Sequence, residues 1–216
     1  MRFRFLFLIL FLSLAAVAGI YQTGLADTGG PYKFFIPVVI SGNAAPTPTA
    51  IFPNETDFVQ SVINQKPDQV TGVYVPNVLA KSVLQQPDSN YTYISSDSKA
   101  VTQYSLATMQ GVTGLLAHNS LAGKYFFDLK TGQQVSIVYG NGTVRHYTIT
   151  QILRYQAVDP ANYASDFIDP ASGEKLSVAE MFAKVYLGSD HVTFQTCITQ
   201  NGNASWGRLF VIAELN

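Results

Sequence analysis

The chain has 216 residues, and its 13 lysines and arginines nearly balance its 14 aspartates and glutamates, giving a formal net charge of -1. This length fits one domain with additional segments, and the balanced charge argues against a nucleic-acid-binding protein, which needs a basic face. The single cysteine excludes an intramolecular disulfide, and the three scattered histidines form no zinc-binding cluster. We therefore expect neither a metal nor a cofactor.

The N-terminal segment, residues 1–20, has the pattern of an export signal. Arg2 and Arg4 precede an apolar run at residues 5–20, and residues 16–18 (AVA) offer a cleavage site. The run is somewhat shorter than the about 20 residues of a membrane span. It predicts either a cleaved signal peptide or a short membrane anchor with the arginines inside. In both cases the remainder is exported, as a secreted protein or one anchored to the cell membrane and facing outside.

Residues 21–55 have the composition of a flexible linker. Residues 27–31 and 42–49 are rich in Gly, Pro and Thr, which favour turns and extended chain. The apolar residues 34–40 between them predict a short strand or a contact near the membrane. The compact domain is predicted over residues 56–216.

Short strands dominate the first half of this domain. Residues 57–65 predict a helix, and residues 70–79 predict a strand in which Pro76 marks an edge or a bulge. Residues 91–95 and 112–118 predict two further strands. The pattern at residues 101–109 fits a helix or a strand equally well.

Residues 134–152 give the clearest local signal. Two stretches in which apolar and polar residues alternate flank a turn that contains Asn141 and Gly142, a pattern typical of a β-hairpin. His146 lies on the more polar face of its strand, and we read it as a surface histidine rather than a catalytic one.

The last part of the chain predicts one helix and two strands. Residues 177–180 (SVAE) form a capping box that begins a helix, and Gly188 follows as a natural stop. Strands are predicted at residues 191–198 and 206–215. Many short strands with few helices predict a mainly β fold, a closed or nearly closed barrel with one or two short peripheral helices.

The only cysteine, Cys197, lies near the end of the first of these strands. Alternation places Val192 and Phe194 on one face, and Gln195 and Cys197 on the other, more polar face. A structural cysteine behaves as a small hydrophobe and would fit better beside Phe194. Either an inert thiol or a nucleophile is compatible with this position, and a nucleophile needs partners that favour its thiolate.

Two residues can serve as those partners. His118 ends an apolar strand just before a loop, a usual place for an active-site residue. Arg208 interrupts an apolar strand 11 residues after Cys197, which leaves room for a turn and an antiparallel return. We therefore expect Cys197 and Arg208 on neighbouring strands, where the guanidinium favours the thiolate and holds an oxyanion or a carbonyl.

Several motifs in this order resemble those of sortases, the cysteine transpeptidases of bacterial cell surfaces. Residues 193–197 (TFQTC) resemble the TLxTC motif, with Phe in place of Leu. Residues 115–119 (LLAHN) resemble the strand that ends in Gly-His, with Ala in place of Gly. Residues 208–213 (RLFVIA) resemble the arginine strand. The similarity extends over about residues 70–215 and also includes residues 73–76 (VYVP) and 123–135, where Gln133 replaces a frequent Asp.

This resemblance implies a transpeptidase that uses Cys197, His118 and Arg208. The Cys197 thiolate would attack a backbone carbonyl of a sorting-signal peptide of the LPxTG or LAxTG type, at the bond that follows a threonine, and an amine acceptor would then receive the peptide. Thr196 and Asn119 are expected to bind substrate. Two alternatives remain open: a sortase-like thiol peptidase that transfers to water, and a non-catalytic, peptide-binding barrel.

Residues 25–29 (LADTG) themselves resemble an LAxTG signal. Sorting signals lie near the C-terminus of their proteins, before an apolar span, whereas this stretch follows the N-terminal apolar run. We read the match as coincidental, because short motifs often match by chance; a self-inhibitory role remains untested.

Overall fold

The computed structural model describes residues 54–216. The predicted signal peptide or anchor, nearly all of the linker and the LADTG stretch lie outside these residues. No helix within residues 54–216 has the length and apolar character needed to cross a bilayer.

Fourteen elements follow one another along the described chain, most of them strands. The helices are α1 (Glu55–Val62), α2 (Ser105–Thr108), the 3-10 helix η1 (Ala122–Asp128) and α3 (Val178–Tyr186). The strands are β1 (Val70–Val75), β2 (Leu79–Gln85), β3 (Ala100–Gln103), β4 (Thr113–Leu116), β5 (Gln134–Tyr139), β6 (Val144–Ala157), β7 (Phe167–Ile168), β8 (Lys175–Leu176), β9 (His191–Gln200) and β10 (Asn203–Leu215).

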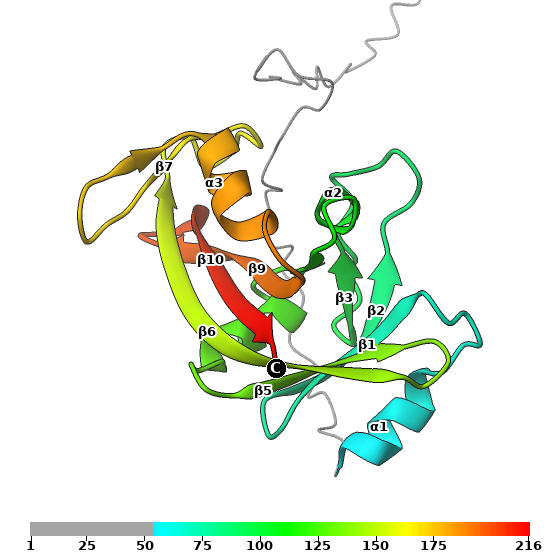
Figure 1. The fold of residues 1–216 in the computed structure, drawn as a ribbon. Coiled ribbons are helices and arrows are strands. Elements are labelled where there is room, and N and C mark those ends of the chain that lie inside the picture. Colours follow the sequence, from blue (N-terminus) through cyan, green and yellow to red (C-terminus); the bar gives the residue numbers. More distant parts are fainter. Residues whose placement is uncertain (1–53) are drawn as a thin grey trace, which may run out of the picture.

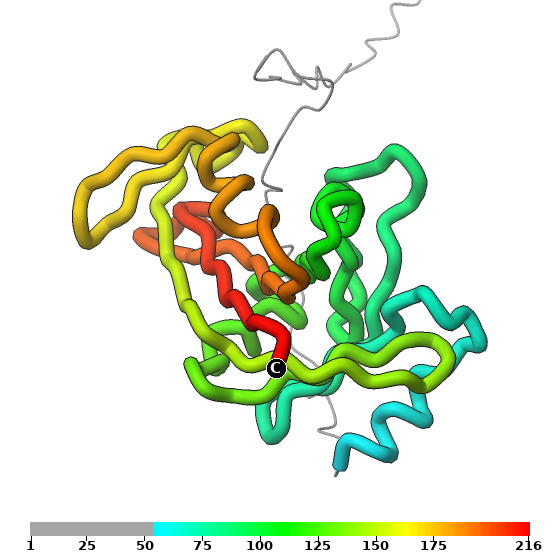
Figure 2. Tube along the Cα trace, in the orientation of Figure 1, coloured from blue at the N-terminus to red at the C-terminus, as the bar shows by residue number. Residues whose placement is uncertain are grey.

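The strands form one sheet that closes on itself. Its order is β10-β9-β4-β3-β2-β1-β5-β6, and β10 also pairs with β6, so that these eight strands make a closed barrel (Figures 1 and 2). The short strands β7 and β8 extend the sheet beyond β6. Most neighbours are antiparallel, but the pairs β2–β3 and β4–β9 are parallel. The predicted mainly β, closed barrel is therefore confirmed.

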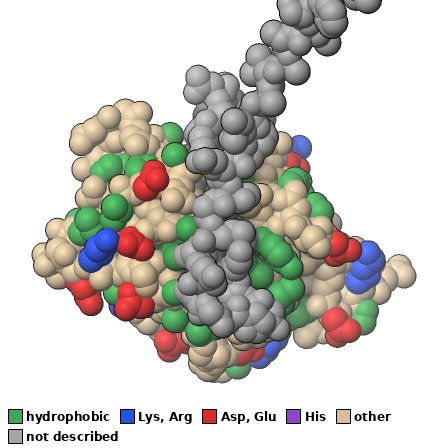
Figure 3. Space-filling view, turned by 90° about the horizontal axis from the view of Figure 1, so that it is seen from above, with side chains coloured by type: hydrophobic (Ala, Val, Ile, Leu, Met, Phe, Trp, Pro, Cys, Tyr) green, Lys and Arg blue, Asp and Glu red, His purple; other side chains and the backbone are tan. Residues whose placement is uncertain are grey.

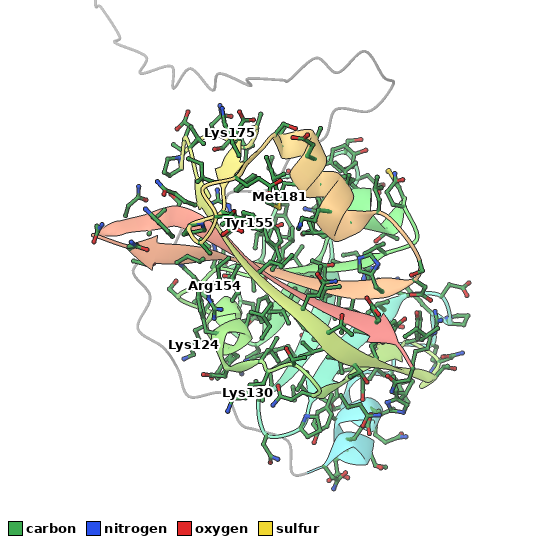
Figure 4. All side chains as sticks on the ribbon, turned by 60° about the vertical axis from the view of Figure 1, so that its left-hand side comes forward. Lys124, Lys130, Arg154, Tyr155, Lys175 and Met181 are labelled. Atoms are coloured by element: carbon green, nitrogen blue, oxygen red, sulfur yellow. The ribbon has the colours of Figure 1, made fainter. Side chains whose placement is uncertain are left out.

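Side-chain alternation separates two apolar layers on the two faces of the barrel wall. The interior is filled mostly by aliphatic side chains, with Phe126 of η1 at the edge of the same cluster. On the outer face, α2 and α3 pack against β4, β6 and β10. Met181 of α3 and Tyr155 of β6 both belong to this outer layer (Figure 4). The same strands can therefore carry an apolar interior and a covered outer face.

Local signals predicted several elements well. Ser177 accepts a hydrogen bond from the Glu180 N–H, and the Glu180 side chain accepts one from the Ser177 N–H, so the capping box of α3 is confirmed. The hairpin around Gly142 is also confirmed, with φ of 85° at that glycine. Residues 101–109 contain both alternatives, the strand β3 followed by α2.

Other predictions were wrong. Residues 70–79 form two strands and not one, because Pro76 and Asn77 make a turn in which Asn77 has φ of 59°. Residues 91–95 form no strand, since the amide of Gln86 binds the carbonyls of Tyr91 and Tyr93 where a neighbouring strand would. Helix α1 begins earlier than predicted, at an Asn54 cap. The short strands β7 and β8 and helix η1 were not predicted.

A lysine lies inside the barrel wall. Lys81 is on the same side of β2 as Leu79 and is 2% exposed. Its Nζ donates to the Ser98 carbonyl over 2.9 Å and lies 4.7 Å from the ring centroid of Tyr125, while Lys124 Nζ lies 5.0 Å from the same ring. Burial, and then repulsion by Lys124, lower the pKa of Lys81 to about 8. The charged amine is therefore a cost to the fold at neutral pH.

Replacing Lys81 by Met should remove a pH-dependent part of the stability. The unfolded chain binds the Lys81 proton more tightly than the folded chain, so the free energy of unfolding should rise as pH increases from about 8 to 10.5. Relative to Lys81→Met, the wild type should gain about 2–3 kcal/mol between neutral and strongly alkaline pH. Urea unfolding at several pH values measures this difference, and a constant offset between the two proteins would contradict it.

Candidate functional site

Three neighbouring strands bring the predicted catalytic residues into one row. In the antiparallel pair β9–β10, Cys197 lies directly opposite Arg208. In the parallel pair β4–β9, Leu116 is level with Gln195. The Ala117 N–H still bonds the Gln195 carbonyl, and extending this register past the end of β4 puts His118 level with Cys197. Because neighbouring strands lie about 4.8 Å apart, the row from His118 through Cys197 to Arg208 spans on the order of 10 Å.

The three side chains also share a face of the wall. Leu116 and Phe210 belong to the outer apolar layer, whereas Phe194 points into the barrel. By alternation, Cys197, Arg208 and the position of His118 lie on the outer face. The register of β9 with both of its neighbours therefore assembles the site.

The backbone around His118 is held firmly. The Ala117 N–H donates to the Gln195 carbonyl over 3.3 Å, and the His118 carbonyl accepts from the N–H groups of Leu121 (2.9 Å) and Gly123 (3.0 Å). A Cβ on Gly123 would collide with the Thr196 hydroxyl and would lie 2.7 Å from the Ala117 and His118 carbonyls. Only glycine lets η1 begin this close to the histidine loop.

Arg208 is a buried cation held by carbonyl groups. It is 0% exposed, and its Nη1 donates to the carbonyls of Ser205 (2.8 Å) and Gly207 (3.0 Å), while Nη2 donates to that of Pro160 (3.4 Å). Among residues 54–216 no carboxylate forms an ion pair with it, and its Nε has no hydrogen-bond partner. Burial lowers the pKa of Arg208, and the charge of a nearby Cys197 thiolate opposes this effect.

Cys197 is also fully buried, at 0% exposed. The face of β9 that was expected to be more polar is covered by α3: Tyr186 Oη donates to Gln195 Oε1 over 2.6 Å, and Thr193 Oγ1 donates to the Val185 carbonyl over 2.6 Å. Polar residues on this face are thus bonded to the helix and do not face water. The sulfur is closed to solvent in this structure.

The chain is similar in structure to sortases. Similar solved structures include sortase A from Listeria monocytogenes (15% identity, 69% of this chain and 88% of that chain, TM-score 0.42). Another is sortase C-1 from Actinomyces oris (15% identity, 76% of this chain and 81% of that chain, TM-score 0.47). A third is sortase C1 from Streptococcus suis (16% identity, 74% of this chain and 78% of that chain, TM-score 0.47). No family model and no curated protein matches the chain. At these identities and scores, the similarities assign no role to any residue.

The two residues expected to bind substrate have different surroundings. Thr196 points away from Cys197, is 0% exposed, and donates its hydroxyl to the Ala117 carbonyl over 2.8 Å. The hydroxyl hydrogen of Thr196 is therefore already bonded within the chain. Asn119 Nδ2 donates to Thr199 Oγ1 (2.9 Å) and to the Ala204 carbonyl (3.0 Å), which leaves its Oδ1 without a partner among the described residues.

The other two histidines lie elsewhere. The His146 side chain is 41% exposed, 3.2 Å from Ser136 Oγ, which agrees with its reading as a surface residue. His191 begins β9, at the end of the strand away from Cys197, and its ring contacts the carbonyls of Ser189 and Val185. Within residues 54–216, no cluster of His, Cys, Asp and Glu side chains could hold a metal ion.

A pocket of about 330 Å³ lies beside the β9–β10 hairpin. Its lining includes Ile198, Trp206, Arg154 and Asp169. Figure 4 shows Arg154 below and to the left of Tyr155, its neighbour on β6. Ile198 belongs to the side of β9 that packs on the barrel interior, opposite to Cys197. The pocket is therefore close to the row of three residues but on the other face of the strand.

The residues that support the site were not predicted from the sequence. Gly123 and Ser120 follow His118 within five residues, and Pro160 lies 48 residues before Arg208. A glycine so soon after a strand end indicates a close backbone approach, so Gly123 could have been found. The Pro160 carbonyl could not, because only tertiary structure brings its loop to Arg208.

Replacing Thr196 by Val should disturb the site through His118. The variant keeps the shape of the side chain but leaves the buried Ala117 carbonyl without its donor, at a cost of about 1–3 kcal/mol in the free energy of unfolding. Because this carbonyl belongs to the residue before His118, the kcat of the peptide cleavage proposed below should fall more than its KM changes. Thr196→Ser, which restores the hydroxyl, should recover most of kcat. Equal behaviour of Val and Ser variants would refute this positioning role.

Proposed function

We propose that this chain is a sortase-like cysteine transpeptidase of the cell surface, with Cys197 as its nucleophile. The observation that carries the proposal is the cross-strand pair of Cys197 and Arg208, with His118 just past the end of the neighbouring strand β4. A thiol opposite a buried cation, with an imidazole in the same row, supplies the nucleophile, the charge and the proton carrier that acyl transfer needs.

The first half-reaction forms a thioester. The Cys197 thiolate attacks the carbonyl carbon of a threonine in a sorting-signal peptide, and a C–S bond forms. The C–N bond of the peptide then breaks, and the His118 imidazolium gives its proton to the departing amine. The LPxTG or LAxTG type of peptide follows from the motif resemblance and is part of the proposal.

Arg208 supplies charge in this scheme. It stays protonated, so it cannot act as a base. A buried cation without a carboxylate partner is costly unless something nearby becomes negative, and the group directly opposite is Cys197. The guanidinium therefore favours the thiolate, and its Nε–H is available to a substrate carbonyl or an oxyanion.

The second half-reaction releases the peptide. An amine acceptor attacks the thioester and gives transpeptidation, whereas water gives hydrolysis. The export pattern of residues 1–20 supports a site outside the cell for this chemistry, on a secreted or membrane-anchored protein. Because the sulfur is closed to solvent here, binding of the peptide must be accompanied by movement of the segments that cover Cys197.

The two alternatives differ in what they require of these residues. A thiol peptidase uses the same row but needs no amine. A non-catalytic barrel that binds peptides has no use for an arginine without an ion-pair partner opposite its only cysteine. Figure 3 shows charged side chains spread around one face of the described residues, between hydrophobic ones.

Peptide cleavage by the full-length chain tests the proposal. Incubation with LPxTG- and LAxTG-type peptides should yield a cleaved product and a mass increase on Cys197. Cys197→Ala should abolish both, and His118→Ala should lower turnover by at least about 100-fold, the usual contribution of a general acid–base. Unchanged circular dichroism controls for folding. If a peptide library gives no cleavage and Cys197 reacts no faster than a free thiol, the chain is not such an enzyme.

Alkylation of Cys197 at different pH values tests the role of Arg208. The wild-type rate should reach half of its maximum at a lower pH than in Arg208→Met, because the guanidinium favours the reactive thiolate. Arg208→Lys should lie between them, since it keeps a charge but loses the planar fork. Identical profiles for all three proteins would remove Arg208 from the proposed mechanism.

A further inference from the structure

Unpartnered polar atoms gather on both sides of Cys197. Asn119 Oδ1, Ser120 Oγ and Arg208 Nε are buried and have no hydrogen-bond partner among residues 54–216. Buried polar atoms are almost always paired, so three of them at one site mark the positions of groups that a ligand supplies. Two of the three follow His118 directly, on the opposite side of Cys197 from Arg208.

Asn119 is held so that its oxygen is fixed in place. Its Nδ2 uses both hydrogens on the β9–β10 hairpin, one to Thr199 Oγ1 over 2.9 Å and one to the Ala204 carbonyl over 3.0 Å. Both N–H groups of the amide are therefore used, and the remaining polar atom, Oδ1, is a hydrogen-bond acceptor. The ligand group that it meets must therefore carry an N–H or O–H.

The position of Asn119 indicates which ligand this is. Thr199 is two residues after Cys197 on the same face of β9, so the Asn119 amide bridges the gap between the histidine loop and the hairpin just beyond the thiol. An incoming amine must give its proton to His118, so it must approach the thioester from the histidine side. Asn119 and Ser120 lie on that side, and Arg208 lies on the other.

We propose that Asn119 Oδ1, with Ser120 Oγ, forms the binding site for the acceptor, a primary amine that enters the second half-reaction. This inference depends on the proposed transpeptidase activity and adds a site to it. Asn119 Oδ1 and Ser120 Oγ share one amine hydrogen, and the other amine hydrogen faces the His118 imidazole, which directs the nitrogen lone pair to the thioester carbon.

The step balances without any other reactant. The amine nitrogen forms a C–N bond with the thioester carbonyl carbon, and the C–S bond breaks with its electron pair staying on sulfur. One amine proton passes to the His118 imidazole. The products are a new amide, the Cys197 thiolate and the His118 imidazolium, which is the starting state of the first half-reaction.

Competition between amine and water tests the site. The full-length chain is incubated with a cleavable sorting peptide and increasing triglycine, and transferred and hydrolysed products are quantified by mass spectrometry. In Asn119→Leu the triglycine concentration for half-maximal transfer should rise about tenfold, the usual effect of one lost hydrogen bond. Ser120→Ala should shift it in the same direction but less. Asn119→Asp keeps an acceptor oxygen and should fall between Leu and wild type.

The controls separate the possible outcomes. Asn141→Ala, in the turn between β5 and β6, should leave the ratio of transfer to hydrolysis unchanged, and circular dichroism reports on folding. If both Asn119→Leu and Ser120→Ala keep the wild-type triglycine dependence, or if transfer and hydrolysis fall by the same factor in both, the acceptor site is refuted while the transpeptidase proposal stands. Absence of any Cys197 acyl-enzyme in the wild type would refute the proposed function and this site together.

Discussion

The hydrogen-bond register of β9 with its two neighbours is the constraint on which the site depends. Antiparallel pairing with β10 sets Cys197 opposite Arg208, and parallel pairing with β4 sets His118 at the same level. A slip of one residue in either ladder would turn one member to the other face of the wall. The register is secured by burial on both faces, since aliphatic side chains fill the barrel and α3 covers the outside. The same ladders thus stabilise the fold and align the three side chains.

Around the row of His118, Cys197 and Arg208, the fold buries polar groups whose burial is costly in free energy. Arg208 is enclosed by carbonyls and faces no carboxylate among the described residues, and Asn119 and Ser120 keep atoms without partners. In contrast, the polar side chains of β9 that lie under α3 are fully bonded, as Gln195 is to Tyr186. The difference separates residues that only complete the packing from residues whose partners must come from outside the chain. It also explains why the row, and not the surface, is the functional candidate.

Much of this arrangement could be predicted from sequence, because its determinants are local. The capping box at Ser177 and the hairpin at Gly142 depend on neighbouring residues, and both are observed. The spacing of Cys197 and Arg208 permitted a hairpin, and the structure contains one. What failed depended on distant contacts. Residues 91–95 have strand-like composition, but the Gln86 side chain donates hydrogen bonds to the carbonyls of Tyr91 and Tyr93. The burial of Cys197 depends on segments outside β9, so the sequence of that strand did not predict it.

Closure of the barrel has a consequence for the order of assembly. Strand β10 pairs with β9 and β6, and it is also the strand that leaves the ribosome after all the others described here. Strand β4 is synthesised early, but its partner β9 lies about 80 residues later in the chain. Pairing between residues so far apart in sequence slows folding. Arg208 belongs to β10, the last strand to be synthesised. Its guanidinium therefore comes to lie opposite the Cys197 thiol only when β10 pairs with β9 and β6 and the barrel closes. A nascent or truncated chain therefore carries an unactivated sulfur, and reactivity appears together with the completed barrel.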